Sequence, residues 1–222
     1  MRSAIGLMAK APVVGQVKTR LCPPMSPGQA LAAAVAMLRD AAEQADATGA
    51  DVWCVHTGHP SLVAPHLPPE TSLLRQRGDG LAERLAAAQH DLHAAGYDRV
   101  LLVGGDCPTV DTSYLMGALE ALSDHAVVLG PAADGGYTLI ASTKPTPALF
   151  AVTMSTTGVL EDTVARAEAE GLGIHLLEAR GDLDTVEDLL LALRSGWLAA
   201  APRTAAVATG LADGRSPEPE PR

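Results

Sequence analysis

The sequence predicts a single α/β domain, a three-layer sandwich in which helices cover both faces of a mostly parallel, mixed sheet. Two observations predict it. Short runs of Val, Leu and Ile alternate along the chain with longer segments in which apolar residues recur every three or four positions. Parallel strands need a crossover between them, usually a helix, so this alternation favours a parallel sheet. Of the 222 residues, 47% are hydrophobic but only 3% are aromatic, which suits helices packed on an aliphatic sheet.

Seven segments are predicted to be strands. Residues 3–9 and 99–103 are apolar almost throughout, as expected for strands that are buried on both faces. Residues that favour turns, mainly Gly, Pro and Asp, follow each segment. The predicted strands are residues 3–9, 51–57, 72–76, 99–103, 126–129, 137–141 and 174–178.

Five helices are predicted between and after these strands. Ser26 is a favourable N-cap and Pro27 a favourable first residue for the first of them. Leu31, Val35 and Leu38 then fall on one face of that helix. The helices begin near residues 27, 81, 112, 158 and 186.

The domain is expected to comprise residues 1–201, followed by a disordered tail at residues 202–222. This last segment is rich in Ala, Thr and Gly, and it ends in alternating Pro and Glu. It has no periodic apolar face that could pack on a core. We therefore expect residues 203–222 to be dispensable for stability.

The formal net charge of −10 excludes binding of nucleic acid or an anionic membrane through bulk charge. Cys22, Cys54 and Cys107 have no metal-binding spacing and are expected to be reduced thiols in a cytoplasmic protein. The apolar run at residues 4–9 is too short for a signal peptide, and no apolar stretch is long enough to span a bilayer. The oligomeric state is left open.

The loop after the first strand is a candidate anion-binding site. Lys10, Lys18 and Arg20 place three cations within eleven residues of an acidic protein, and Gly15 lets backbone N–H groups approach a ligand. Arg offers a fork suited to phosphate and Lys a point charge. The glycine spacing is not that of a P-loop. The alternative is a solvated basic loop without a ligand.

Carboxylates follow two of the other strands. Asp106 lies in a Gly/Pro turn after residues 99–103, where it is a natural Mg²⁺ ligand or merely a residue that stabilises the turn. Asp182 and Asp184 precede the last helix, and we expect their side chains to point to opposite sides. Asp184 or Thr185 is expected to cap that helix.

A third loop combines Asp134 with Gly135 and Gly136 between two predicted strands. Two adjacent glycines after an Asp indicate backbone in a special conformation. This segment is either part of a site or an ordinary hairpin turn.

Together these segments resemble the nucleotide-diphospho-sugar transferases, which have the GT-A type of α/β fold. They are most similar to an uncharacterised bacterial branch, often labelled glycosyltransferase, and more distantly to the phospholactate guanylyltransferases. The resemblance covers about residues 4–195. Met154 stands where the family often has Trp, a departure that falls in the acceptor half of the site. The matching stretches are residues 9–21, 78–85, 104–108, 130–137, 155–156 and 182–189.

The resemblance implies a role for each stretch. It implies Mg²⁺ or Mn²⁺ as cofactor, a nucleotide or a nucleotide-sugar as one substrate and a small molecule as acceptor. Catalysis is expected from Lys18, Arg20 and Asp106. The expected metal ligands are Asp106 and one of Asp182 and Asp184. The nucleotide is expected at Lys10, Gly15, Lys18, Thr19, Arg20, Gly80 and Arg84, and the acceptor at Asp134, Gly135, Gly136, Tyr137, Ser155 and Thr156.

Three functions are compatible with these residues. A nucleotidyltransferase would transfer the nucleotide of an NTP to a phosphorylated or other oxyanion acceptor and release pyrophosphate. A glycosyltransferase would use a nucleotide-sugar donor. A non-catalytic nucleotide-binding protein would need no pair of metal-binding carboxylates. The cations of the first loop suit a triphosphate better than a diphosphate, which slightly favours nucleotidyl transfer.

Overall fold

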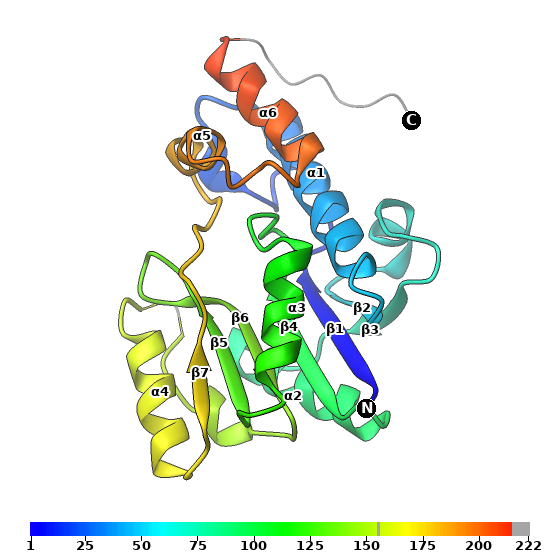
Figure 1. Cartoon of the computed structure of the whole chain (residues 1–222). Helices are drawn as coiled ribbons and strands as arrows, with labels where there is room; N and C mark the ends of the chain where they lie inside the picture. The colour runs from blue at the N-terminus through cyan, green and yellow to red at the C-terminus, as the bar shows by residue number, and fades with distance from the viewer. Residues whose placement is uncertain (155, 215–222) are drawn as a thin grey trace.

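The computed structural model describes residues 1–154 and 156–214. Its centre is one seven-stranded sheet with the strand order β3-β2-β1-β4-β6-β5-β7 (Figure 1). All pairs are parallel except those of β6, which runs antiparallel to both β4 and β5. The predicted α/β fold and all seven predicted strands are confirmed. The strands are β1 Ser3–Ala9, β2 Asp51–His56, β3 Ser72–Arg75, β4 Arg99–Gly104, β5 Val127–Pro131, β6 Tyr137–Ser142 and β7 Ile174–Leu176.

The direction of β6 follows from its connection to β5. Only residues 132–136 separate the two strands, and so short a connection permits a hairpin but not a parallel crossover. The hairpin places this turn at the edge of the sheet where β1, β4 and β5 end. The loops that the sequence marks as candidate sites therefore share one edge, the usual place for ligands in such sheets.

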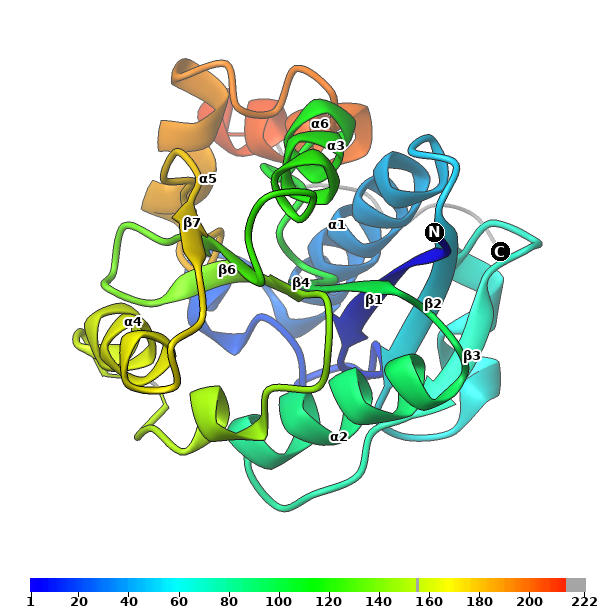
Figure 2. The same ribbon diagram turned by 60° about the horizontal axis from the view of Figure 1, so that its bottom comes forward.

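Helices cover both faces of the sheet, as Figure 2 shows: α1 and α3 lie on one face, and α2 and α4 on the other. Each face has its own apolar core, with alternate side chains of β1 and β4 pointing into one or the other. In the described residues no helix has the length and hydrophobicity to cross a membrane. The helices are α1 Pro27–Asp46, α2 Leu81–Ala94, α3 Thr112–Ala121, α4 Val159–Ala169, α5 Val186–Arg194 and α6 Pro202–Ala212.

Local sequence signals determine where α1 and α5 begin. The Ser26 side chain accepts from the Gln29 backbone N–H, and the Gln29 side chain accepts in return from the Ser26 N–H. Thr185 and Asp188 form the same reciprocal pair at the start of α5. Such capping boxes satisfy two otherwise unpaired backbone donors. Because Thr185 caps α5, the Asp184 carboxylate is available for other contacts.

The expectation of a disordered tail is wrong for residues 202–214, while residues 215–222 lie outside the described part of the chain. Residues 202–212 form α6, which packs against α1 and α5 and buries Val207 and Ala208 (Figure 1). The buried Asp40 carboxylate of α1 accepts from the Thr204 backbone N–H at 2.7 Å and from its hydroxyl at 2.8 Å. Arg203 also bonds Asp40 and Glu43. Sequence periodicity missed this helix because its packed residues are small.

Truncation after Ala201 is therefore expected to destabilise the protein, contrary to the dispensability expected from the sequence. It removes every partner that the structure gives the buried Asp40 side chain. It also removes the apolar packing of α6 on α1 and α5; each buried apolar side chain lost or uncovered costs about 1.5–3 kcal/mol, and two such side chains correspond to a fall in Tm of roughly 10 °C for a chain of this size. The fall in Tm is measured by thermal unfolding of a chain that ends at Ala201 and, as a control, of a chain that ends at Gly214. Equal melting temperatures would contradict the prediction.

Candidate active site

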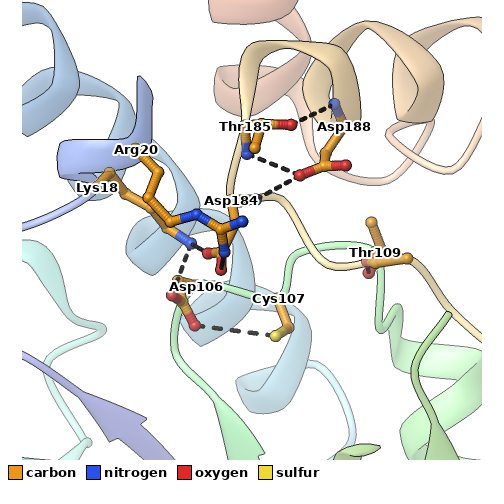
Figure 3. A network of polar contacts seen from close by, with 9 residues as sticks. Lys18, Arg20, Asp106, Cys107, Thr109, Asp184, Thr185 and Asp188 are labelled. Atoms are coloured by element: carbon orange, nitrogen blue, oxygen red, sulfur yellow. Dashed lines mark hydrogen bonds and ion pairs between the residues drawn. The ribbon is translucent and has the colours of Figure 1, made fainter. Parts of the chain in front are cut away.

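Three segments meet at the carboxyl edge of the sheet: the loop after β1, the turn after β4 and the chain before α5 (Figure 3). The Lys18 ammonium lies between two carboxylates, with Nζ 2.7 Å from Asp106 Oδ2 and 2.9 Å from Asp184 Oδ1. Arg20 Nη1 lies 2.8 Å from the other Asp184 oxygen. Four residues that the sequence marks for one site are thus joined in a single ionic network.

The backbone around Lys18 is held from both sides. Lys18 adopts the left-handed conformation, with φ 45° and ψ 39°, which is uncommon for a residue other than Gly. Val17 before it and Leu21 after it are buried and anchor the loop in the core. Its own side chain is only 7% exposed. Burial acts to lower the pKa of Lys18, but Asp106 and Asp184 outweigh burial and raise it, so the ammonium stays charged.

Asp184 is held as an anion. Burial acts to raise the pKa of its carboxyl, yet the nearby cations of Lys18 and Arg20 lower it overall. Neighbouring Asp182 behaves in the opposite way: burial and the charges of Asp134, Asp184 and Asp106 raise its pKa to about 6. Cationic partners thus compensate Asp184, whereas Asp182 is half-buried next to other carboxylates, and no ion pair is recorded for it among the described residues.

The expectation that Asp182 and Asp184 point to opposite sides is wrong. Both side chains line one cavity, whereas Leu183 between them is buried in the core below α5. Residues two apart in an extended chain share a side, and the residue between them faces away. The buried Leu183 therefore aims both carboxylates at the site.

The donor set fits a divalent cation of the Mg²⁺ or Mn²⁺ kind. Asp106 and Asp184 already converge on one cation, Lys18 Nζ, and Asp182 lines the same cavity as both of them. Carboxylate oxygens are the ligands these metals prefer. Among the described residues no three or more His, Cys, Asp or Glu side chains are grouped tightly enough to form a complete metal site. Substrate and water oxygens would have to complete the coordination.

The Cys107 thiol beside Asp106 has low chemical reactivity. Its Sγ lies 3.8 Å from Asp106 Oδ1. Burial first, and then the Asp106 charge, raise the pKa of this thiol well above its usual range. A neutral buried thiol is a poor nucleophile and a poor metal ligand.

A first cavity of about 440 Å³ opens beside the loop after β1 and is lined by that loop, by α1 and α2, and by residues that follow β2, β3 and β4 or precede α5. Lys10, Thr19 and Arg84, for which the resemblance implies nucleotide binding, line it together with Lys18, Arg20 and Asp106. Gly15 and Gly80 are not part of its lining. Gly15 lies at the exposed tip of the loop with φ 73°, and Gly80 caps the start of α2.

The sequence reasoning missed several residues of this cavity. Gln76 follows β3 and lines the cavity while its amide donates to the backbone oxygens of Val55, at 2.8 Å, and Ala9, at 3.2 Å. Thr57 follows β2 and accepts from the Ala11 N–H. The only available signal was that each is the polar residue with which a predicted strand ends. The wall that α1 contributes cannot be read from the sequence.

A second cavity of about 360 Å³ adjoins the first, and both are lined by Met8, Leu81, Asp106 and Asp184. The predicted acceptor residues Asp134, Gly136, Tyr137 and Thr156 line the second cavity. Ser155 lies outside the described residues. The two cavities thus meet at the Asp106–Asp184 pair.

Gly135 has a structural role instead of lining the second cavity. Its φ is 88°, and a Cβ there would overlap the Thr157 carbonyl oxygen. Its own carbonyl accepts from the Leu160 N–H at 3.0 Å. The β5–β6 turn is thereby clamped against the start of α4. The loop is thus a hairpin turn, and its Asp134 and Gly136 also line the second cavity.

Comparison with known proteins places the chain in a family. The sequence pattern of a family described as "Uncharacterized protein conserved in bacteria (DUF2064)" matches residues 31–156. The chain belongs to this family. No curated protein matched the sequence of this DUF2064 protein.

Solved structures resemble the DUF2064 protein over most of its length. One, from Desulfovibrio desulfuricans, is provisionally described as a nucleotide-diphospho-sugar transferase; it has a TM-score of 0.89 and 28% identity, and the match covers 96% of each chain. The resemblance to this superfamily is therefore confirmed.

Two more distant structures share only the fold. The 4-diphosphocytidyl-2C-methyl-D-erythritol synthase of Anaerococcus prevotii matches with a TM-score of 0.57 and 12% identity, over 86% of the DUF2064 protein and 96% of the synthase. The Rv0371c protein of Mycobacterium tuberculosis, solved with manganese, matches with a TM-score of 0.54 and 17% identity, over 88% and 100% of the respective chains.

Proposed function

We propose that this protein is a divalent-metal-dependent transferase that uses a nucleotide as donor, and that it transfers the nucleotidyl group. One observation carries the proposal: Lys18 and Arg20 meet Asp106 and Asp184 at the junction of two cavities. A transferase needs two substrates side by side, with charge stabilisation at the point where they meet. The likeness to a structure provisionally described as a nucleotide-diphospho-sugar transferase, and to a cytidylyl-type synthase by fold, supports a transferase.

The first cavity suits a nucleotide. Lys10, Arg20 and Arg84 line it and can meet phosphate oxygens, while Ala34 and Leu38 of α1 provide an apolar surface for a base. Lys18 has three N–H donors, of which two point to carboxylates, so one remains for a phosphate oxygen. The polyphosphate would then lie over the Asp106–Asp184 pair.

Asp106, with Asp184 or Asp182, would hold the divalent metal. A divalent ion bound there neutralises phosphate charge and stabilises the leaving diphosphate. The manganese in the structure of the Rv0371c protein, which shares this fold, agrees with such a requirement. Asp182 lines the same cavity as Asp106 and Asp184, which supports the same assignment.

In the proposed reaction an oxygen of the acceptor forms a bond to the α-phosphorus of an NTP. The bond from that phosphorus to the oxygen that bridges it to the β-phosphate breaks, and pyrophosphate leaves with the bonding electrons. Lys18 and Arg20 would orient the phosphates and balance the charge of the departing group. The second cavity would hold the acceptor on the other side of Asp106.

Glycosyl transfer from a nucleotide-sugar is the second candidate, and one observation favours it. The closely similar Desulfovibrio desulfuricans structure is provisionally described as a nucleotide-diphospho-sugar transferase. In that reaction the acceptor oxygen would bond to the anomeric carbon of the sugar, and a nucleoside diphosphate would leave. The two candidates differ in the number of phosphates that the first cavity should prefer: three for nucleotidyl transfer and two for glycosyl transfer.

The proposal predicts that, with Mg²⁺ present, a nucleoside triphosphate binds more tightly than the matching nucleotide-sugar. The terminal phosphates bring additional negative charge to Lys10 and Arg20, and each charge-assisted contact contributes about 1.5–3 kcal/mol. Calorimetric titration with ATP, GTP, CTP, UTP and the corresponding nucleotide-sugars measures this difference. Replacing the exposed Lys10 by Ala should weaken triphosphate binding more than nucleotide-sugar binding.

A nucleotide-sugar that binds tightly while every triphosphate binds weakly would assign the protein to glycosyl transfer. Absence of binding by both classes would reject the proposal as a whole. A cytoplasmic location, and the absence of nucleic-acid and membrane partners, accompany the proposal as predictions from composition and charge.

A further inference from the structure

The two cavities differ in the charges that line them. The first contains Lys10, Lys18, Arg20 and Arg84. The second, as far as the described residues define it, contains four Asp side chains and not one Lys, Arg or His. The shared Asp106 and Asp184 lie at the boundary between the cavities, and the remaining two carboxylates belong to the second cavity alone. They are Asp134 and Asp182.

This charge is only partly compensated. Lys18 and Arg20, which do not line the second cavity, pair with Asp106 and Asp184. In the described part of the chain no ion pair is recorded for Asp134 or Asp182. A divalent ion on two of the four carboxylates would balance only those two. A phosphate ester placed here would bring about two further negative charges next to Asp134 or Asp182, which is unfavourable.

Several hydrogen-bond donors of the cavity already have acceptors, whereas its carboxylates offer acceptor oxygens. The Thr138 hydroxyl donates to the Gly130 carbonyl at 3.3 Å, and the Thr156 hydroxyl donates to the Thr153 carbonyl at 3.2 Å. The Gly136 N–H already donates to Asp134 Oδ1 at 2.9 Å. An ionised carboxylate can only accept. The cavity therefore complements a molecule that donates hydrogen bonds, such as one with hydroxyl or ammonium groups.

The rest of the lining is apolar. Leu85 and Val159 come from the helices below the sheet, and Leu102 and Ile140 from the sheet itself. Such walls suit the C–H surface of a small aliphatic or sugar-like body. Together, the charge, the acceptors and the walls describe one class of ligand.

We infer that the second cavity binds an uncharged or positively charged hydroxyl-bearing molecule, a polyol or an amino alcohol, and discriminates against phosphate esters. The binding preference is argued from the cavity alone. That the bound molecule is the acceptor of the reaction rests on the proposed function. A polyol or amino alcohol thus takes the place of the phosphorylated or oxyanion acceptor that was expected from the sequence.

The inference changes one step of the chemistry. A hydroxyl acceptor, unlike a phosphate, carries a proton that must leave as its oxygen bonds to phosphorus. The carboxylates of the cavity can accept this proton while pyrophosphate departs from the other side. The product would be a phosphodiester that joins the acceptor to the nucleotide.

The test uses compounds that differ only by a phosphate. Each compound is titrated into the protein, with and without Mg²⁺ and an NTP, and its binding is observed by saturation-transfer NMR. The pairs are glycerol and glycerol 3-phosphate, glucose and glucose 6-phosphate, and ethanolamine and phosphoethanolamine. In every pair of which one member binds, the unphosphorylated compound is expected to bind at least about tenfold more tightly. Asp134→Arg is expected to abolish or reverse this preference, because Asp134 lines the cavity and is itself exposed.

Asp124→Arg is the matched control, since Asp124 is exposed and lies near the end of α3, outside both cavities. It makes the same change in net charge and should leave the preference unaltered. Asp134→Asn is the milder variant if the arginine substitution prevents folding, and it should weaken ethanolamine binding. The inference is overturned if phosphate esters bind the unmodified protein as tightly as their parent compounds, or if no parent compound binds. Failure of the proposed function would appear separately, as a loss of NTP binding in the first cavity.

Discussion

Asp106→Asn is expected to lower metal-dependent turnover by at least about a hundredfold. The substitution keeps the size of the side chain but removes the negative charge at the junction of the two cavities. An amide oxygen is a much weaker ligand for Mg²⁺ than a carboxylate, and even groups that only support metal ligands typically contribute 10–100-fold. Turnover is measured as pyrophosphate released from an NTP, or as nucleoside diphosphate released from a nucleotide-sugar, over a series of Mg²⁺ concentrations.

The fold should tolerate this change. Lys18 keeps its second partner, Asp184, 2.9 Å from Nζ, and the loss of one carboxylate relieves repulsion at Asp182. We therefore expect the melting temperature to change by only a few degrees. Asp124→Asn, an exposed site outside both cavities, is the control for the loss of a carboxylate. Full activity of Asp106→Asn would mean that Asp106 only stabilises the turn after β4.

Lys18→Met is expected to strengthen the binding of Mn²⁺ in the absence of nucleotide by about tenfold or more. In the structure the Lys18 ammonium lies 2.7 and 2.9 Å from the oxygens of Asp106 and Asp184 that a metal ion would use. The ammonium and a divalent ion compete for the same oxygens, so the lysine should keep the affinity for free metal low. Met retains the apolar stem and removes the charge. Electron paramagnetic resonance of free and bound Mn²⁺ measures the affinity directly, without any turnover.

The same variant should bind a triphosphate more weakly, by roughly tenfold to a hundredfold, because a charge-assisted hydrogen bond is lost. Lys10→Met is the matched control: it removes a cation that lines the first cavity but has no recorded contact with Asp106 or Asp184. It should weaken triphosphate binding and leave Mn²⁺ binding unchanged. If Lys18→Met binds Mn²⁺ no better than the unmodified protein, Lys18 does not compete with the metal.

Local sequence pattern was sufficient for most of the secondary structure. The capping pair Ser26–Gln29 and the apolar run of β4 act over a few residues, so a short window of sequence contains the whole signal. The helix at residues 202–212 is the exception. Its packed side chains are mostly small, so they give only a weak apolar pattern. The contact with Asp40 that orients this helix joins residues 164 positions apart, so a short window of sequence does not include both partners.

The sequence by itself determined the fold class, the strands and the loops that carry Lys18, Arg20, Asp106 and Asp134, because glycines, prolines and charges mark where strands end. Only the tertiary structure decided which of these groups meet. Lys18 and Asp184 are 166 residues apart, and it is the buried Leu183 that turns Asp182 and Asp184 toward the same cavity. The separation into a cationic and an acidic cavity also depends on segments that are distant in sequence. The strand β6, which lies between β4 and β5, lines only the second cavity, and α2 lines both cavities. Charges in sequence order do not reveal their neighbours, because electrostatic interaction depends on distance in space.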